Sequence, residues 1–464
     1  MLCSLMRPRL LLPILSLVAG GATSVSAAVA AAAPPYAPGE VVVRYAAGVD
    51  RAERAAIQRA TGTARPEAFA PHARTLRIRR GASVAGTVSA LRRRPGVATA
   101  TPNWIARASG FIPNDPGASA LPGGWASLQW NFLPDVGVNA PEAWATLIRA
   151  GRPGGAGVTV AVLDTGVAYA DARRFRRSPD LSGSRLRKGY DFVADDPYPD
   201  DQNGHGTHVA STIAESADNQ VGLTGLAYGA RIMPVRVLDG RGEGTSTDIA
   251  RGIRYSARTG ADVINLSFEF APEVRAASIP DVLSALRYAR RKGALVVGAS
   301  GNAGDPVVAY PARSPLMVAV GATTERGCQA DYSNRGSDLD LVAPGGGPDA
   351  ALGADPRCRP GEPPGRDIFQ VTFEGGSVRR FGIPDGYVGT SMAAPHVSAV
   401  AAMVIAAGVL GRAPAPERLE RHLEATARDL GTPGRDSRYG AGLLDAARAT
   451  APVAPVASTR GRRF

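Results

Sequence analysis

Residues 158–167 read Val-Thr-Val-Ala-Val-Leu-Asp-Thr-Gly-Val, an apolar run that ends in an acid. The run Val158–Leu163 is short and continuous, which predicts a strand that is buried on both faces. Asp164, at the end of this strand, is costly to bury unless another group pairs with it. The stretch therefore predicts a core strand with a chemically active side chain at its carboxyl end.

Further short apolar runs follow this strand and alternate with helical patterns of ten or more residues. We expect strands over Arg231–Leu238, Asp262–Phe268 and Ala294–Ala299, and helices after His205, over Thr247–Arg258 and over Asp281–Arg291. This alternation predicts an α/β fold, with a doubly wound, mostly parallel sheet covered by helices on both faces. Ligands of such sheets bind at the carboxyl ends of the strands.

The pattern before residue 109 predicts a separate small α+β domain over residues 31–108. Its expected strands are Val41–Tyr45, Thr75–Ile78 and Val97–Ala100, and its expected helices are Arg51–Ala60 and Ser83–Arg92. Residues 109–124 are rich in Ala, Gly, Ser and Pro and read as an exposed, cleavable linker. The main domain then covers residues 125–450, and residues 451–464 read as a disordered tail.

The first 30 residues have the character of a signal peptide. Arg7 and Arg9 precede an apolar run over Leu10–Ala19, and small residues follow it. That run is short for the ~20 residues of a membrane span, and no later stretch is long and apolar enough to cross a bilayer. We therefore expect a secreted protein, periplasmic or extracellular, with no membrane span once the leader is removed.

Charge and cysteine content narrow the class of protein further. The formal net charge is +12, but residues 31–108 alone hold 13 Arg against four acidic residues, so the main domain is nearly neutral. This distribution argues against a nucleic-acid partner. Beyond the leader the chain holds Cys328 and Cys358, and an oxidising compartment favours a disulfide between them.

Three segments carry reactive side chains at predicted strand ends or helix starts. They are Asp164, the pair His205 and His208 among glycines, and Ser391 at the start of an alanine-rich helix. Taken singly, each of these residues could have a purely structural role, as a structural acid, a packed imidazole or a helix cap. Together, in the order Asp, His, Ser, they supply the nucleophile, base and orienting acid that acyl transfer requires.

From these segments onward the sequence resembles the subtilisin family of serine endopeptidases, of the secreted, thermitase-like bacterial type, over roughly residues 125–450. Smaller matches are Tyr310-Pro311, Val318–Gly321, Leu341–Gly345 and Gly440–Asp445. The resemblance implies a catalytic triad of Asp164, His205 and Ser391 and gives His208 a packing role. It also implies that the amide of Asn302 donates to the oxyanion. Residues 31–108 resemble that family's inhibitory propeptide, a ferredoxin-like domain of a self-processing zymogen that is cut within about 103–112.

One departure from the family lies in the strand that binds substrate. The family usually has Ser-Leu-Gly-Gly where this chain has Ser267-Phe268-Glu269-Phe270. With Gly301, the residues Ser267, Phe268 and Glu269 are the expected substrate-binding positions, with narrower walls than usual. Glu269 is hypothesised to favour a basic substrate residue near the scissile bond; the alternative is that it points to solvent.

Calcium is the one cofactor that the resemblance implies. Asp191, Asp196 and Asp200 resemble a thermitase-like acidic site, although Ala194 replaces one expected acid. A second candidate site, of Asp115, Asn219 and Val221, is weakened because Arg173 stands where the family has an aspartate, nine residues after the triad acid. Residues 345–386 look like an insertion, expected to form a surface excursion held to Cys328 by Cys358.

Two other classes of function remain open at this stage. A catalytically silent protein of the same fold could capture peptides by strand pairing. Alternatively, the basic domain over 31–108 could adhere to membranes or nucleic acid, which would be sensitive to salt. The preferred interpretation is a monomeric serine endopeptidase that acts on polypeptide substrates and whose own propeptide inhibits it.

Overall fold

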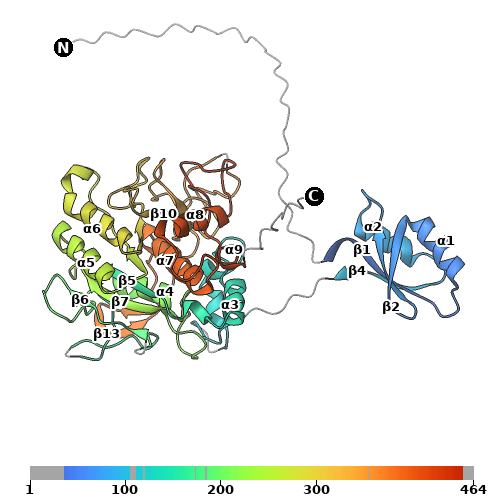
Figure 1. The fold of residues 1–464 in the computed structure, drawn as a ribbon, viewed down its shortest axis with the longest axis horizontal. Helices are drawn as coiled ribbons and strands as arrows, with labels where there is room; N and C mark the ends of the chain where they lie inside the picture. The colour runs from blue at the N-terminus through green and yellow to red at the C-terminus, as the bar shows by residue number, and fades with distance from the viewer. Residues whose placement is uncertain are drawn as a thin grey trace, which may run out of the picture. The chain divides into compact units, whose positions relative to one another are not determined.

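The computed structural model describes residues 36–104, 111–118, 121–172, 174–182, 185–353 and 355–452 of the 464-residue chain. The expected signal peptide, part of the linker and nearly all of the expected tail lie outside these residues. The chain divides into two compact units, Met1–Ser109 and Gly110–Phe464. Each unit is described by itself (Figure 1).

The small unit has the order βαββαβ. Its elements are β1 (Tyr36–Tyr45), α1 (Arg51–Thr61), β2 (Thr63–Ala70), β3 (Ala73–Ile78), α2 (Val84–Arg92) and β4 (Val97–Trp104). The antiparallel sheet has the order β2-β3-β1-β4, and both helices share one core with it. Asp50 caps α1 by accepting a 2.8 Å hydrogen bond from the N–H of Glu53. The ferredoxin-like α+β prediction is confirmed.

Strand β2 is the element of the small unit that the sequence pattern did not predict. It contains Pro66 and few β-branched residues, both unfavourable for a strand. Among the described strands it pairs with β3 alone, at an edge of the sheet. Edge strands tolerate proline because one side of the backbone needs no partner, so tertiary pairing outweighs the weak local preference.

The large unit is built on a parallel sheet of seven strands in the order β11-β10-β9-β8-β5-β7-β6. Its strands are β5 (Thr159–Asp164), β6 (Tyr190–Asp191), β7 (Arg231–Arg236), β8 (Val263–Leu266), β9 (Leu295–Ala299), β10 (Val318–Thr323) and β11 (Leu341–Pro344). The order of the strands reverses at β5, which β7 and β8 flank. The carboxyl ends of β5, β8 and β9 therefore lie at the same edge of the sheet.

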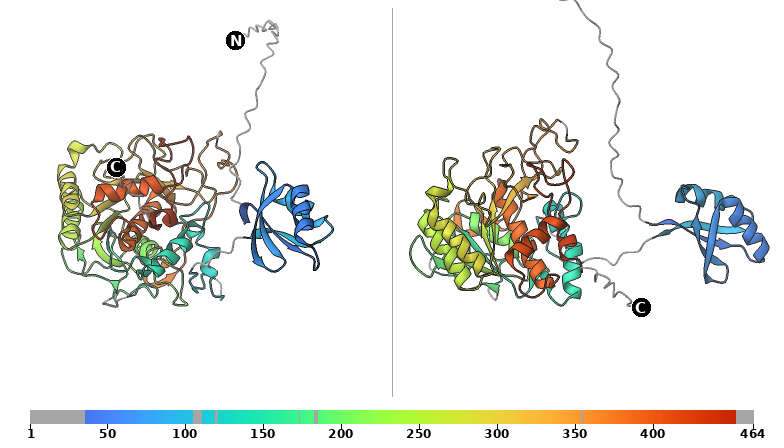
Figure 2. Two further views of the ribbon diagram at one scale, coloured as in Figure 1. Left: turned by 45° about the vertical axis from the view of Figure 1, so that its right-hand side comes forward. Right: turned by 45° about the horizontal axis from the view of Figure 1, so that its top comes forward.

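Helices cover both faces of this sheet, which confirms the doubly wound prediction (Figures 1 and 2). They are α3 (Ala140–Arg149), α4 (His205–Ala214), α5 (Ser246–Arg258), α6 (Pro280–Arg291), α7 (Thr390–Ala407), α8 (Pro416–Thr426) and α9 (Ala446–Thr450). Alternate residues of β5 serve the two layers, since Val160 and Val162 join the core that contains α7, whereas Ala161 and Leu163 join the core of α5 and α6. The apolar run of β5 is thus explained by burial on both faces.

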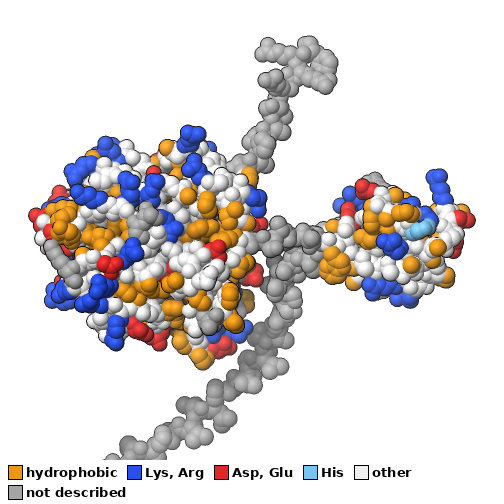
Figure 3. Space-filling model, turned by 90° about the horizontal axis from the view of Figure 1, so that it is seen from below, with side chains coloured by type: hydrophobic (Ala, Val, Ile, Leu, Met, Phe, Trp, Pro, Cys, Tyr) orange, Lys and Arg blue, Asp and Glu red, His pale blue; other side chains and the backbone are white. Residues whose placement is uncertain are grey.

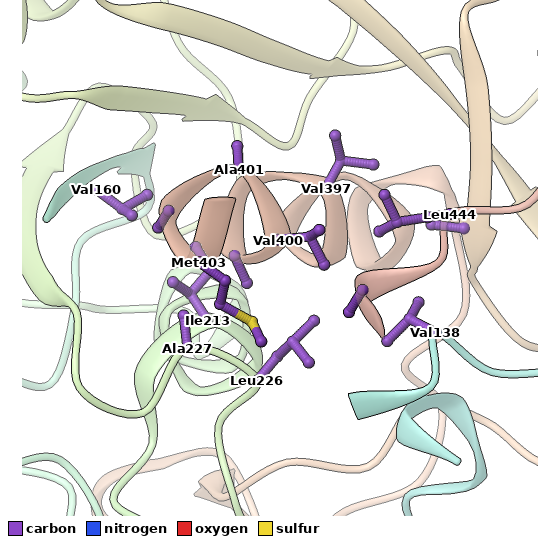
Figure 4. Packing of buried hydrophobic residues seen from close by; sticks show 14 of the residues in the cluster. Val138, Val160, Ile213, Leu226, Ala227, Val397, Val400, Ala401, Met403 and Leu444 are labelled. Atoms are coloured by element: carbon purple, nitrogen blue, oxygen red, sulfur yellow. The ribbon is translucent and has the colours of Figure 1, made fainter. Parts of the chain in front are cut away.

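Helix α7 is the centre of the larger core. In Figure 4, Met403 of α7 lies close to Ile213 of α4 and to Ala227. The expectation that no later stretch is long and apolar enough to cross a bilayer is wrong for α7 by length and composition. However, 78% of its apolar window is buried inside the unit, as in the core helix of a globular domain. Its uniform apolarity therefore reflects contact on all sides.

Part of the expected linker belongs to the large unit in the structure. Asp115 is fully buried, Gly117 donates its N–H to the carbonyl of Gly222, and the indole of Trp125 donates to the carbonyl of Pro113. These contacts fix residues 113–117 against the rest of the large unit. The exposed, cleavable character expected over 109–124 does not apply to them.

The expectation of a surface excursion over 345–386 is wrong for its second half. Ile368, Gln370 and Thr372 are fully buried, and Gln129 donates to the side-chain oxygen of Gln370 at 3.1 Å. The hairpin of β12 (Thr372–Glu374) and β13 (Ser377–Gly382) follows. The polar groups of residues 368–372 form hydrogen bonds inside the core, and the sequence pattern alone does not reveal these partners. In the first half of this segment, Cys358 forms the expected disulfide with Cys328.

Candidate active site

The carboxylate at the end of β5 pairs with the imidazole at the start of α4. Nδ1 of His205 lies 2.8 Å from Oδ1 of Asp164, which also accepts a 2.7 Å hydrogen bond from the N–H of Thr165. Asp164 is fully buried, whereas 25% of the His205 side chain is exposed. The structure therefore brings together two of the three residues of the expected triad.

Gly206 permits this close approach. A Cβ at this position would lie 2.1 Å from the carbonyl oxygen of Gly166 and 3.1 Å from the Cβ of Asp164. Any other residue would push the first turn of α4 away from the end of β5. The glycine that follows His205 is thus required by the distance between helix and strand.

A second acid, Asp201, holds the loop before α4 in place and was missed by the sequence analysis. Its carboxylate accepts hydrogen bonds from the N–H groups of Asn203, Gly204 and Thr207 and from the hydroxyls of Thr165 and Thr207. The negative charge also lies at the N-terminus of α4, where the helix dipole favours it. Its position before the helix was the available sign of a cap.

Two opposing effects set the pKa of His205. Burial alone would lower it, but the charge and hydrogen bond of Asp164, with the charge of Asp201 behind them, outweigh burial and raise the pKa above its ordinary value. The same carboxylate that orients the imidazole thus stabilises its protonated form. This is the electrostatic arrangement that a general base needs when it takes a proton.

Ser391 lies in the first turn of α7 and is partly exposed. The hydroxyl of Ser267, just beyond β8, donates to the carbonyl of Ser391 at 2.8 Å. In the described part of the chain, no hydrogen bond joins the Ser391 hydroxyl to His205. Catalytic hydrogen bonds are often long before substrate binds, so the open geometry is compatible with a nucleophile and its base.

The amide of Asn302 has a fixed orientation. Its oxygen accepts hydrogen bonds from the N–H and hydroxyl of Thr390 at 2.8 and 3.0 Å, so its nitrogen faces away from α7. Asn302 is exposed, and Thr390 directly precedes Ser391. Gly301 donates its N–H to the Thr390 hydroxyl at 3.2 Å. The amide nitrogen lies 3.5 Å from Oε1 of Glu269, and the oxyanion role that the resemblance implies stays a prediction.

The four residues from Ser267 to Phe270, three of which are expected to bind substrate, separate into two groups. Glu269 and Phe270 line a cavity of about 250 Å³ together with Asn302. Phe268 instead packs against the core of α5 and α6, and Ser267 is buried beneath α7. Only the two residues that replace the family's glycines therefore narrow the pocket.

His208 has the packing role that the resemblance gave it. It is fully buried, its Nε2 lies 2.8 Å from the carbonyl oxygen of Ile368, and its ring stacks on Tyr387 with centroids 4.1 Å apart. Burial lowers the pKa of His208 to about 3, so the ring is neutral. A neutral, enclosed imidazole is unsuited to proton transfer at the serine.

The acidic turn before α4 does not fit a calcium site. Asp191 forms a buried ion pair with Arg236 at 2.7 Å, and its other oxygen accepts backbone N–H groups. Asp196 and Asp200 line the same surface pocket. However, no three acidic, His or Cys side chains among the described residues are gathered closely enough to hold a metal. Arg236 already neutralises the best candidate ligand.

The second candidate site contains an acid, Asp180, that the sequence analysis did not include. Asp180, sixteen residues after Asp164, accepts a 2.7 Å hydrogen bond from the amide of Asn219. Asp115 accepts the N–H groups of Asp218 and Asn219. Arg173, whose position weakened this site in the sequence, lies outside the described residues. Asp180 thus adds a carboxylate near Asn219 that the sequence analysis did not assign to this site.

The acids near Asn219 are buried, and the groups around them do not fully offset their negative charge. Asp115, Asp180 and Glu215 are fully buried, and Oε2 of Glu215 has no hydrogen-bond partner among the described residues. Burial raises the pKa of Asp180 to about 8, with repulsion from Asp115 adding to it and the charge of Arg185 opposing it. Burial and the charge of Asp180 raise the pKa of Glu215 as well. Like the acidic turn, the cluster does not gather three acidic, His or Cys side chains closely enough to form a metal site among the described residues.

Comparison with known proteins agrees with this geometry. The subtilase family (Peptidase_S8) matches residues 155–442, and the Fervidolysin N-terminal prodomain matches residues 22–103. The thermophilic serine proteinase of Bacillus sp. (strain AK1) is 34% identical over 374 residues, which cover 80% of this chain and 79% of the relative. Thermitase of Thermoactinomyces vulgaris is 33% identical over 298 residues, covering 64% and 87%.

A solved structure gives the same result. The chain is similar to a structure of proteases from Pseudoalteromonas arctica, with a TM-score of 0.57 and 30% identity, over 73% of this chain and 99% of that one. The matched family covers the whole sheet and the segments that carry Asp164, His205 and Ser391. The chain therefore belongs to the subtilase family of serine endopeptidases and carries an N-terminal prodomain of the fervidolysin type.

Proposed function

We propose that the chain hydrolyses peptide bonds through an acyl-enzyme formed on Ser391, with His205 as the base and Asp164 as the acid that orients it. The observation that carries the proposal is the 2.8 Å contact between His205 and the buried Asp164, on a sheet whose neighbouring strands lead to Ser267 and Asn302 beside Ser391. Acyl transfer needs these three roles and a donor to the oxyanion. The fixed amide of Asn302 supplies that donor.

The steps follow from these positions. The hydroxyl of Ser391 attacks the substrate carbonyl while Nε2 of His205 takes its proton, and the new charge on the imidazole is stabilised by Asp164. The oxyanion accepts hydrogen bonds from the amide of Asn302 and the N–H of Ser391 at the start of α7. His205 then gives the proton to the departing amine. Water then attacks the ester between the substrate and Ser391, again with His205 as the base, and releases the carboxylic acid product and free Ser391.

The small unit is proposed to act as an intramolecular inhibitor that the enzyme itself removes. The match of residues 22–103 to a protease prodomain family supports this role. We also propose that the protein is secreted after removal of residues 1–30, as the leader pattern and the related subtilisins indicate.

On the face shown in Figure 3, both units carry exposed basic side chains among acidic and hydrophobic ones.

Structural calcium is proposed at the cluster of Asp115, Asp180 and Asn219. Calcium prefers carboxylate oxygens, and subtilases commonly bind it. The amide oxygen of Asn219 accepts the N–H of Val221, the third expected residue of this site, and its nitrogen donates to Asp180. The fit rests on two fully buried carboxylates whose charge Arg185 opposes only in part. A bound cation would hold both carboxylates ionised and fasten the residues after α4 to those before α3. It would take no part in the chemistry at Ser391.

The catalytic proposal is tested by expressing the wild-type chain beside Ser391→Ala and following the mass of each. We expect the wild type to shorten and to cleave casein, and the variant to remain full length. Addition of active wild type to the variant should then shorten it in trans. A Ser391→Ala chain that still shortens itself in purified form would contradict the proposed nucleophile.

A further inference from the structure

The cavity of about 250 Å³ beside Asn302 has a defined place in the reaction. It lies between the segments that follow β8 and β9, with Glu269 and Phe270 on one side and Asn302 and Ala303 on the other. The carbonyl under attack must point at Asn302, and the side chain of the same residue is attached one carbon away. The cavity therefore receives the side chain on the carbonyl side of the cleaved bond.

Glu269 reaches across this cavity from one wall to the other. Both of its carboxylate oxygens lie 3.1 Å from the backbone nitrogen of Asn302, and Oε1 lies 3.5 Å from the Asn302 side-chain nitrogen. Gly301 makes room for the carboxylate, since a Cβ there would lie 2.3 Å from Oε2. The side chain is exposed at the cavity and does not point away into free solvent.

The charge of this carboxylate has no cationic partner in the described part of the chain. Two arginines also line the cavity and neither contacts Glu269: Arg313 is paired with Asp338 at 3.3 Å, and Arg275, which keeps its charge, donates to the carbonyl of Pro272. The remaining charged group in the lining, Asp305, is a second acid whose repulsion adds to the effect of burial on Glu269 and raises its pKa. A cationic guest would relieve both effects.

We infer that Glu269 makes this cavity selective for an Arg or Lys side chain on the carbonyl side of the cleaved bond. The inference rests on the proposed function and names its substrate class. A guanidinium or ammonium group would form charge-assisted hydrogen bonds with the carboxylate. A large apolar side chain would bury the same carboxylate against a group that cannot hydrogen-bond, which is unfavourable.

The test compares fluorogenic peptides that differ only at this position, as Arg, Lys, Leu or Phe. For the wild type we expect kcat/KM for Arg and Lys to exceed that for Phe by about tenfold or more. Glu269→Gln should reduce the preference for Arg over Phe by about tenfold, because the charge is lost and the shape is kept. Glu269→Gly should open the cavity and raise kcat/KM for Phe. Glu273→Gln, on the same loop but outside the cavity lining, is the control. It should leave the preference for Arg over Phe and the kcat/KM for Phe at their wild-type values.

Covalent labelling with a fluorophosphonate separates the two possible failures. If the wild type is not labelled, the proposed function fails. If all variants are labelled and folded but Glu269→Gln and Glu269→Gly keep the wild-type profile, the inference about Glu269 is wrong and the function stands. A wild type that prefers Phe or Leu would also overturn it. If Glu269→Gln does not fold, the glycine variant decides.

Discussion

The hydroxyl of Ser267 donates a hydrogen bond of 2.8 Å to the backbone carbonyl of Ser391. In a regular helix this carbonyl would accept the N–H four residues later, but that residue is Pro395, which has none. Asn265 in turn donates to Ser267, and Ser398 donates to Asn265, both at 2.8 Å. A buried chain of hydrogen bonds therefore ties the end of β8 to the turn that carries the nucleophile.

Replacement of Ser267 by alanine should destabilise the large unit by about 1–3 kcal/mol, because the partly buried carbonyl of Ser391 would lose its donor. Urea unfolding in a Ser391→Ala background, where self-digestion is absent, measures this change. Ser278→Ala, on the exposed surface, is the control and should shift stability by less than about 0.5 kcal/mol. Equal effects of the two substitutions would contradict the role given to Ser267.

The pH dependence of kcat/KM should reflect the raised pKa of His205. The base must be neutral, so activity should rise with pH through a value above the ordinary His value of about 6.5. Asp164→Asn removes the charge that raises the pKa, so the rising limb should move to lower pH while kcat falls by about 10⁴. Rate profiles over pH for both proteins test this. A limb that stays in place would mean that Asp164 does not set the pKa.

The acidic cluster should make stability depend on calcium and pH together. The pKa of Asp180 is raised in the folded state, so without calcium its contribution favours folding below about 3.9 and is lost as pH rises through the raised value. Added calcium should therefore raise the melting temperature most at alkaline pH, and a chelator should lower it. Asp180→Asn should remove most of this dependence. Asp191→Asn, at the turn that does not fit a metal, should leave the calcium effect in place.

Self-processing should follow the same selectivity as the cavity beside Asn302. Between residues 105 and 124 the sequence holds one basic residue, Arg107. If Glu269 selects Arg or Lys, cleavage should occur after Arg107 and leave Ala108 at the new N-terminus, which N-terminal sequencing of the shortened chain would show. Arg107→Gln should slow the shortening, whereas Arg94→Gln, inside the small unit, should not. A new terminus far from residue 108 would contradict the link between specificity and processing.

Local pattern was sufficient for most of the scaffold. Burial on both faces made β5 recognisable as a continuous apolar run, and Asp50 marked the start of α1 as a cap. Such features depend on neighbours a few positions away, so they are visible in a window of sequence. Strand β2 was missed because its pairing with β3 outweighs a composition that disfavours a strand.

The sequence by itself determined the order of Asp164, His205 and Ser391 and the glycines that let strand and helix approach. Only the tertiary structure decided which more distant side chains complete the site. Asp201 accepts the N–H of Thr207 in the first turn of α4, Asp180 accepts a hydrogen bond from Asn219, and Glu269 accepts one from the backbone of Asn302. Loop lengths and strand order set the last two contacts, which join residues 33 to 39 positions apart. No local pattern encodes such distances, because they are fixed only when the sheet brings the carboxyl ends of its strands together.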